Sequence, residues 1–176
     1  MRFRGVHHVE INVPEYDKAI PFYDRMFGWL GYSSFETLGI EYMSTYYVAF
    51  PHSYIGIQPA KSEEPYLFED FKPGINHIAL HANNRKGIDR FYKEFLLKEG
   101  VRVLDSPQEY PLYAPGYYSV FYLDPAGIKW ELAHFPLIPS PWAFWKWYQL
   151  LKQEKEKHPA WKKHPIFEGM RKLPRP

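Results

Sequence analysis

Two histidines, one carboxylate and one amide are the residues of this sequence best suited to chemistry. Each lies on a short segment in which apolar and polar residues alternate, so successive side chains point to opposite faces of a strand. All are on the row opposite the apolar one: His8, Gln58, His77 and Glu131. Imidazole, carboxylate and amide donors suit Fe(II), Mn(II), Ni(II), Co(II) or Zn(II). The pattern predicts one divalent metal ion as cofactor and leaves its identity open.

An internal repeat gives a reason for these residues to meet. The shift that carries Gly5–Ile11 onto Gly74–Leu80 also carries Phe22 and Tyr23 onto Phe91 and Tyr92 without a gap. The chain therefore contains two tandem copies of one supersecondary unit. A pseudo-twofold relation between the copies would bring the equivalent histidines, His8 and His77, to the centre of one concave face.

The hydrophobic pattern of each copy predicts a βαβββ module. Strands are expected at residues 6–13, 32–37, 41–50 and 54–59 with a helix at 15–27, and at 75–82, 101–104, 117–123 and 128–133 with a helix at 85–99. The predicted fold class is α+β, with both modules forming a curved eight-stranded mixed sheet and the helices outside. Residues 1–135 make one domain: module one at 4–60, an acidic linker at 61–73 and module two at 74–135.

Residues 136–176 lie beyond the repeat. Pro136, Pro139 and Pro141 break the chain, and residues 142–157 then show a helical pattern rich in aromatic side chains. We expect an aromatic C-terminal helical extension that packs on a partner subunit, with covering of the cleft as the alternative.

Composition excludes several classes of protein. The net charge of +2 gives no reason to expect nucleic acid as a partner, and the absence of cysteine excludes disulfides and thiolate ligands. No apolar run is long enough to span a membrane, and the N-terminus lacks the apolar core of a secretory signal. We expect a cytoplasmic protein without a membrane partner.

The turn before the last strand carries the clearest family resemblance. Asp124-Pro125-Ala126-Gly127 forms a tight turn ahead of Glu131, and together with the repeated His8 and His77 segments it resembles the signatures of the vicinal-oxygen-chelate (glyoxalase/bleomycin resistance protein/dioxygenase) superfamily. The resemblance covers about residues 4–135. It implies paired βαβββ modules, a divalent metal at His8, Gln58, His77 and Glu131, a small-molecule substrate that chelates the metal through adjacent oxygens, and a homodimer.

The resemblance also implies a reaction class. Isomerase, epimerase or lyase chemistry on a small carbonyl substrate, through a metal-stabilised enediolate, needs a carboxylate that moves a proton, and the candidates are Glu131 and Glu41. Glutamine at position 58 resembles methylmalonyl-CoA epimerases, whereas bacterial glyoxalase I types usually have glutamate there. The substrate pocket is expected to involve Tyr110, Tyr113 and Tyr117.

Two other functions stay open. Extradiol-type Fe(II) dioxygenases share the two-histidine, one-carboxylate set, but residues 113–119 lack the histidine that these enzymes carry before the turn. Non-catalytic drug-binding or resistance proteins of the family usually lack the metal ligands that this chain has.

Overall fold

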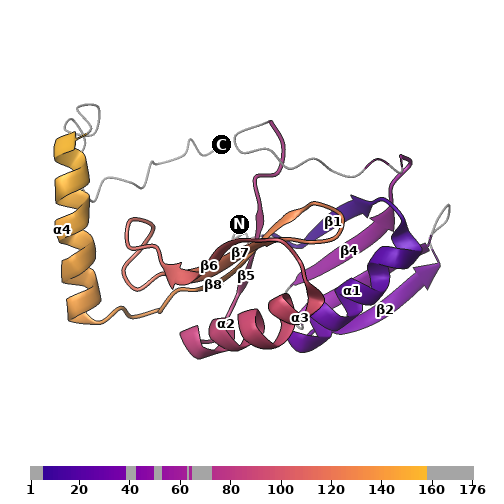
Figure 1. Cartoon of the computed structure of the whole chain (residues 1–176), viewed down its shortest axis with the longest axis horizontal. Helices are drawn as coiled ribbons and strands as arrows, with labels where there is room; N and C mark the ends of the chain where they lie inside the picture. Colours follow the sequence, from indigo (N-terminus) through magenta and orange to yellow (C-terminus); the bar gives the residue numbers. More distant parts are fainter. Residues whose placement is uncertain (1–5, 39–42, 50–52, 63, 65–72, 158–176) are drawn as a thin grey trace, which may run out of the picture.

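The computed structural model describes residues 6–38, 43–49, 53–62, 64 and 73–157. The first module has the predicted order of one strand, one helix and three strands (Figure 1). Its elements are β1 (His8–Val13), α1 (Tyr16–Trp29), β2 (Ser33–Leu38), β3 (Met43–Ala49) and β4 (Ser53–Pro59).

The second module repeats this order with an interrupted helix. α2 (Arg85–Phe91) continues through a π-helical turn (Tyr92–Leu96) into α3 (Leu97–Glu99). The strands are β5 (Ile78–His81), β6 (Val103–Glu109), β7 (Tyr118–Leu123) and β8 (Lys129–His134). The predicted α+β fold with two βαβββ modules is confirmed.

Hydrogen bonds divide the eight strands equally between two mixed sheets, instead of joining them in the single eight-stranded sheet that was predicted. The strand orders are β1-β4-β3-β2 and β5-β8-β7-β6, and no pairing joins the two sheets among the described residues. In each sheet the first strand lies at an edge, parallel to the last strand of its module, and the other pairs are antiparallel. The two sheets therefore have the same topology, as the sequence repeat requires.

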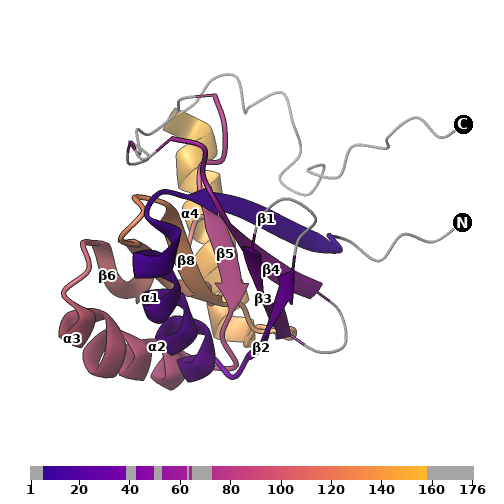
Figure 2. The same ribbon diagram turned by 90° about the vertical axis from the view of Figure 1, so that its right-hand side faces the viewer.

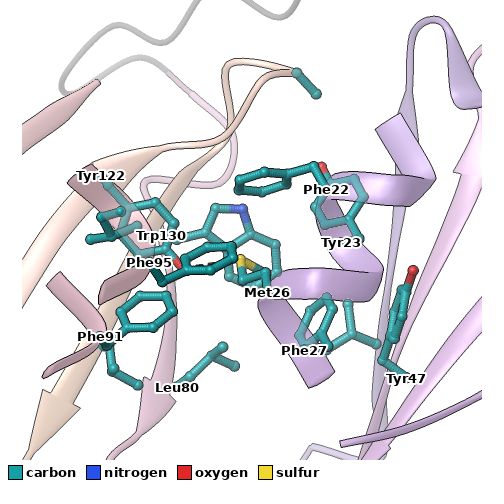
Figure 3. Packing of buried hydrophobic residues seen from close by; sticks show 14 of the residues in the cluster. Phe22, Tyr23, Met26, Phe27, Tyr47, Leu80, Phe91, Phe95, Tyr122 and Trp130 are labelled. Atoms are coloured by element: carbon teal, nitrogen blue, oxygen red, sulfur yellow. Dashed lines mark hydrogen bonds between the residues drawn. The ribbon is translucent and has the colours of Figure 1, made fainter. Parts of the chain in front are cut away.

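One hydrophobic core holds the modules together (Figure 3). Phe27 of α1 stacks on Tyr47 of β3 with ring centroids 4.4 Å apart, and it also meets Trp130 of β8 at 5.8 Å. The hydroxyl of Tyr23 in α1 donates a 2.6 Å hydrogen bond to Asp124, in the turn before β8. The helices thus cover the apolar faces of the sheets, and the row that carries the candidate ligands is on the opposite faces.

The predicted C-terminal helix is α4 (Pro141–Lys157). It stands at one end of the molecule in Figure 1, beyond β6 and β8, and lies behind the sheets in Figure 2. None of its residues is buried, and Trp142, Phe144 and Trp145 are exposed. Within the described ranges, no helix combines the length and apolar character that crossing a membrane requires.

Candidate functional site

His77 and Glu131 lie together on one face of the second sheet. β5 and β8 are neighbouring parallel strands with Ala79 opposite Glu131, and His77 directly precedes β5. Because side chains alternate along a strand, residues 77 and 79 share the face of Glu131. His77 Nε2 is 3.1 Å from Glu131 Oε2, and the two side chains are 32% and 2% exposed.

The hydrogen bond made by Nδ1 of His77 determines the role of Nε2. Nδ1 lies 2.7 Å from the side-chain oxygen of Asn76, which can only accept, so Nδ1 donates this hydrogen bond. In a neutral imidazole, Nε2 then carries a lone pair directed at a carboxylate oxygen 3.1 Å away. Two acceptors at this distance repel unless a proton or a cation lies between them. The pair therefore suits two ligands of one metal ion or a protonated histidine beside a carboxylate.

Tyr117 holds the other oxygen of the carboxylate. Its hydroxyl donates a 2.9 Å hydrogen bond to Glu131 Oε1, so both oxygens of this buried group have partners. Burial, followed by this hydrogen bond, raises the pKa of Tyr117 above its usual range, so the hydroxyl remains a donor at neutral pH. The bond fixes the orientation of the Glu131 carboxylate.

Further aromatic rings continue from this pair along the same face. Phe121 lies edge-on to His77 at 5.5 Å, Tyr110 lies edge-on to Phe121 at 5.4 Å, and Tyr113 stacks on Tyr110 at 5.3 Å. The three tyrosines assigned to the substrate pocket are therefore grouped beside His77 and Glu131. Tyr118 instead donates a 2.7 Å hydrogen bond to Asp89 of α2, so it belongs to the helical side of the sheet.

His8 lies on the first sheet, apart from this group. Its ring is exposed, stacks on Tyr54 at 4.7 Å, and has Nδ1 2.8 Å from Nδ1 of His7. In the part of the chain that the structure describes, no three His, Asp or Glu side chains form a group able to hold a metal ion. A single chain thus joins His77 to Glu131 and does not bring His8 to them.

Gln58 is buried in β4, opposite Asn12 of β1. The sequence repeat carries Glu10 onto Ala79, and these residues face Gly56 and Glu131 respectively. Gly56 is therefore the first module's equivalent of Glu131, and Gln58 lies two residues farther along the strand. The other proton-transfer candidate, Glu41, falls outside the described residues.

A family model for the glyoxalase/bleomycin resistance protein/dioxygenase superfamily matches residues 5–132. The chain belongs to this superfamily. The uncharacterised protein YqjT of Bacillus subtilis (strain 168) is 30% identical to it over 132 residues, which make up 72% of this chain and 96% of YqjT. The resemblance predicted from the sequence is confirmed, and the match ends before α4.

Solved structures of the superfamily share the fold. A candidate glyoxalase from Bacillus halodurans has a TM-score of 0.61 and 28% identity, over 75% of this chain and 96% of its own. A glyoxylase/bleomycin resistance protein/dioxygenase domain from Frankia sp. EAN1pec has a TM-score of 0.62 and 20% identity, over 77% of this chain and 95% of its own. A mutant of the fosfomycin resistance protein FosX from Listeria monocytogenes, complexed with Mn(II) and 1S,2S-dihydroxypropylphosphonic acid, has a TM-score of 0.56 and 18% identity. The match covers 77% of this chain and 95% of FosX.

Sequence reasoning did not single out Asn76 or Phe121, which orient and flank His77. Asn76 precedes the regular part of β5, where alternation gives no information about its contacts. Phe121 is one of four consecutive buried residues of β7, so burial does not distinguish it from its neighbours. Once Glu131 is chosen, strand pairing identifies Phe121, because it is directly opposite Glu131 in the antiparallel pair.

Proposed function

We propose that this superfamily member is a divalent-metal enzyme with isomerase, epimerase or lyase activity on a small substrate that carries oxygens on adjacent atoms. The observation that carries the proposal is the 3.1 Å approach of His77 Nε2 to the buried Glu131 carboxylate. Two ligands bound at right angles, each about 2.1 Å from a metal, lie about 3 Å apart. The donation from His77 Nδ1 to Asn76 also matches the usual support of a metal-binding histidine.

The ligands bound to FosX support this substrate class. That protein is described with Mn(II) and a dihydroxypropylphosphonic acid whose hydroxyls are on adjacent carbons. In this chain, a divalent ion held by His77 and Glu131 would supply positive charge beside a substrate oxygen, which favours loss of a proton from the neighbouring carbon. The three grouped tyrosines would enclose and orient the substrate.

Glu131 and Glu41 are the residues that we propose for proton transfer. Glu131 is next to the reacting centre in this scheme, and the hydrogen bond from Tyr117 holds one of its oxygens in place. A carboxylate placed beside the bound substrate can accept a proton from the carbon next to the metal-bound oxygen. Gln58, buried on the first sheet, would be the weakest of the proposed ligands.

We also propose that the site is completed by a second copy of the chain. His77 and Glu131 are two ligands, whereas His8 is exposed on the other sheet of the same chain. In the proposed symmetric dimer, His8 of one copy would meet His77 and Glu131 of the other, and the twofold axis would make the two sites equivalent. The Nδ1 contact with His7 leaves Nε2 of His8 as the nitrogen that would bind the metal.

Substitution of His77 tests the proposal. In protein purified without a His-tag and reconstituted with Mn(II), Ni(II), Co(II) or Zn(II), His77→Ala should lower metal affinity at least about tenfold while helical circular dichroism is unchanged. His81→Ala is the matched control, because His81 is exposed on the same face of β5. Equal metal binding by wild type and His77→Ala would refute the site. Bound iron with oxygen consumption would favour a dioxygenase, and wild type that binds no divalent ion would favour a binding protein.

A further inference from the structure

A cavity of about 230 Å³ lies between α4 and the end of the second sheet. One wall comes from α4, which is outside the segment that matches the superfamily. The opposite wall comes from α2, the end of β6 and the loop before β7. The side chains that determine its chemistry are Arg85, Glu109, Tyr117, Trp142, Lys146 and Trp147, and we call it the α4 cavity.

The α4 cavity has an excess of positive charge. Arg85 Nη1 is 2.6 Å from Glu109 Oε1, and Lys146 Nζ is 3.0 Å from Glu109 Oε2. These hydrogen bonds, first from Arg85 and then from Lys146, hold the pKa of Glu109 below its usual range, so it is ionised at neutral pH. Two cations therefore share one carboxylate, which leaves one net positive charge at the cavity.

The other walls are flat and apolar. Trp142 and Trp147 face the cavity from α4, and Pro111 and Pro115 face it from the loop. Trp142 is 68% exposed, so covering its ring removes apolar surface from water. Sites for whole drug-sized ligands span about 300–1,000 Å³, so this smaller cavity suits a single ring.

Tyr117 connects the α4 cavity to the candidate metal site. Tyr117 lines the cavity, and its hydroxyl donates a hydrogen bond to Glu131. A group bound in the cavity is therefore separated from the Glu131 carboxylate by one residue.

We propose that the α4 cavity binds an aromatic carboxylate group, with the ring against Trp142 and Trp147 and the carboxylate at Arg85 and Lys146. The cavity holds the non-reacting end of the substrate, an assignment that rests on the proposed function. Ring and anion binding by themselves do not depend on a metal.

Benzoate is a suitable probe, with benzamide as its neutral counterpart and acetate as the anion without a ring. Ligand-observed saturation-transfer NMR on the full chain should give saturable benzoate binding, and benzamide and acetate should each bind at least about threefold more weakly. Benzoate affinity should fall as ionic strength rises. Equal binding of benzamide would overturn the role of charge, and equal binding of acetate would overturn the role of the ring.

Two substitutions with opposite effects on charge separate binding from a merely structural role. Lys146→Gln removes the excess charge and should weaken benzoate binding about threefold or more, whereas Glu109→Gln raises the net charge and should strengthen it. Both variants remove the ion pair between Lys146 of α4 and Glu109 of β6. If that contact only holds α4 in place, both should weaken binding, and this result would overturn the proposal.

Two controls keep the outcomes distinct. Lys152→Gln changes an exposed lysine of α4 that does not line the cavity, so it should leave benzoate affinity unchanged. His77→Ala should also bind benzoate as the wild type does, because His77 is not part of the cavity. Failure of metal binding with retained benzoate binding would refute the proposed enzyme and leave the cavity standing; the reverse result would refute the cavity alone.

Discussion

Asp124 is a buried carboxylate that links the two modules. It accepts hydrogen bonds from the Tyr23 hydroxyl at 2.6 Å, Trp130 Nε1 at 2.7 Å and the backbone N–H of Ile128 at 2.9 Å. Burial raises the pKa of Asp124 above its usual range, although these donors act in the opposite direction. Tyr23 belongs to α1 and Trp130 to β8, so one side chain fixes a helix of the first module to the last strand of the second.

Asp124→Asn tests this link and its dependence on pH. The amide replaces one acceptor oxygen with a donor, so it leaves buried donors unsatisfied and should lower the free energy of unfolding by about 1–3 kcal/mol. A carboxyl group whose pKa is raised in the folded state stabilises the fold below its unfolded pKa and loses that contribution as pH rises through the folded pKa. Urea unfolding should therefore give a larger difference between wild type and variant at about pH 4 than at about pH 7. A difference that grows with pH would contradict the raised pKa.

Strand alternation predicted His77 and Glu131 on the face opposite the apolar row, and the structure brings these two side chains together. The same reasoning placed Gln58 on the last strand of the first module, near the point that matches Glu131, whereas the strand register makes Gly56 the equivalent of Glu131. Alternation defines the face of a strand, and a shift of two residues preserves that face. Sequence alone therefore could not fix the position along the strand. The aromatic group around His77 could not be predicted from the sequence either, because it depends on contacts between β6, β7 and the loop that joins them.

Helices were predicted more accurately than the irregular strand β6. The predicted helix at 85–99 coincides with α2, the π-helical turn and α3 taken together. The strand predicted at 101–104 instead runs from Val103 to Glu109, with register shifts on both sides of Asp105. Asp105-Ser106-Pro107 reads as a turn in the sequence, because proline cannot donate to a strand ladder. The irregular pairing accommodates Pro107 on this edge strand, which local propensity does not anticipate.

Substitution of Gly28 and Gly116 by alanine should change the free energy of unfolding in opposite directions. Gly28 is in α1, and a Cβ there would meet no atom within 4 Å, so Gly28→Ala should raise the free energy of unfolding by about 0.5–1 kcal/mol. Gly116 has a φ of +81°, and a Cβ there would lie 3.0 Å from Pro136 Cγ. Gly116→Ala should destabilise by about 1 kcal/mol or more. Chemical denaturation of both variants measures these changes, and stabilisation by Gly116→Ala would show that the loop before Tyr117 tolerates that backbone without glycine.

The molecule as a whole has one shared core but two separate faces that carry the candidate ligands. Both sheets direct apolar residues toward the helices, and α1 contacts both modules (Figure 3). The repeat correctly predicts two modules of identical topology, yet it does not determine whether their sheets join or whether the equivalent faces meet within one chain. That choice depends on packing between modules, for which periodicity carries no information. In the proposed dimer, the exposed His8 face of one copy would meet the His77–Glu131 face of the other.

Mixed dimers test whether the metal site is shared between chains. In a dimer of one His8→Ala chain and one His77→Ala chain, one site keeps His8 of one chain with His77 and Glu131 of the other, and the second site loses both histidines. Random assortment makes about half of all dimers mixed, so co-expression should restore about one quarter of the wild-type metal capacity. Mn(II) titration followed by electron paramagnetic resonance measures the capacity, and each variant alone provides the baseline.

The matched control mixes His77→Ala with Glu131→Gln, whose lesions lie on the same face, so every site keeps one lesion and capacity stays at the baseline. If His8 binds the metal within its own chain, the first mixture also stays at the baseline, because every site then lacks one histidine.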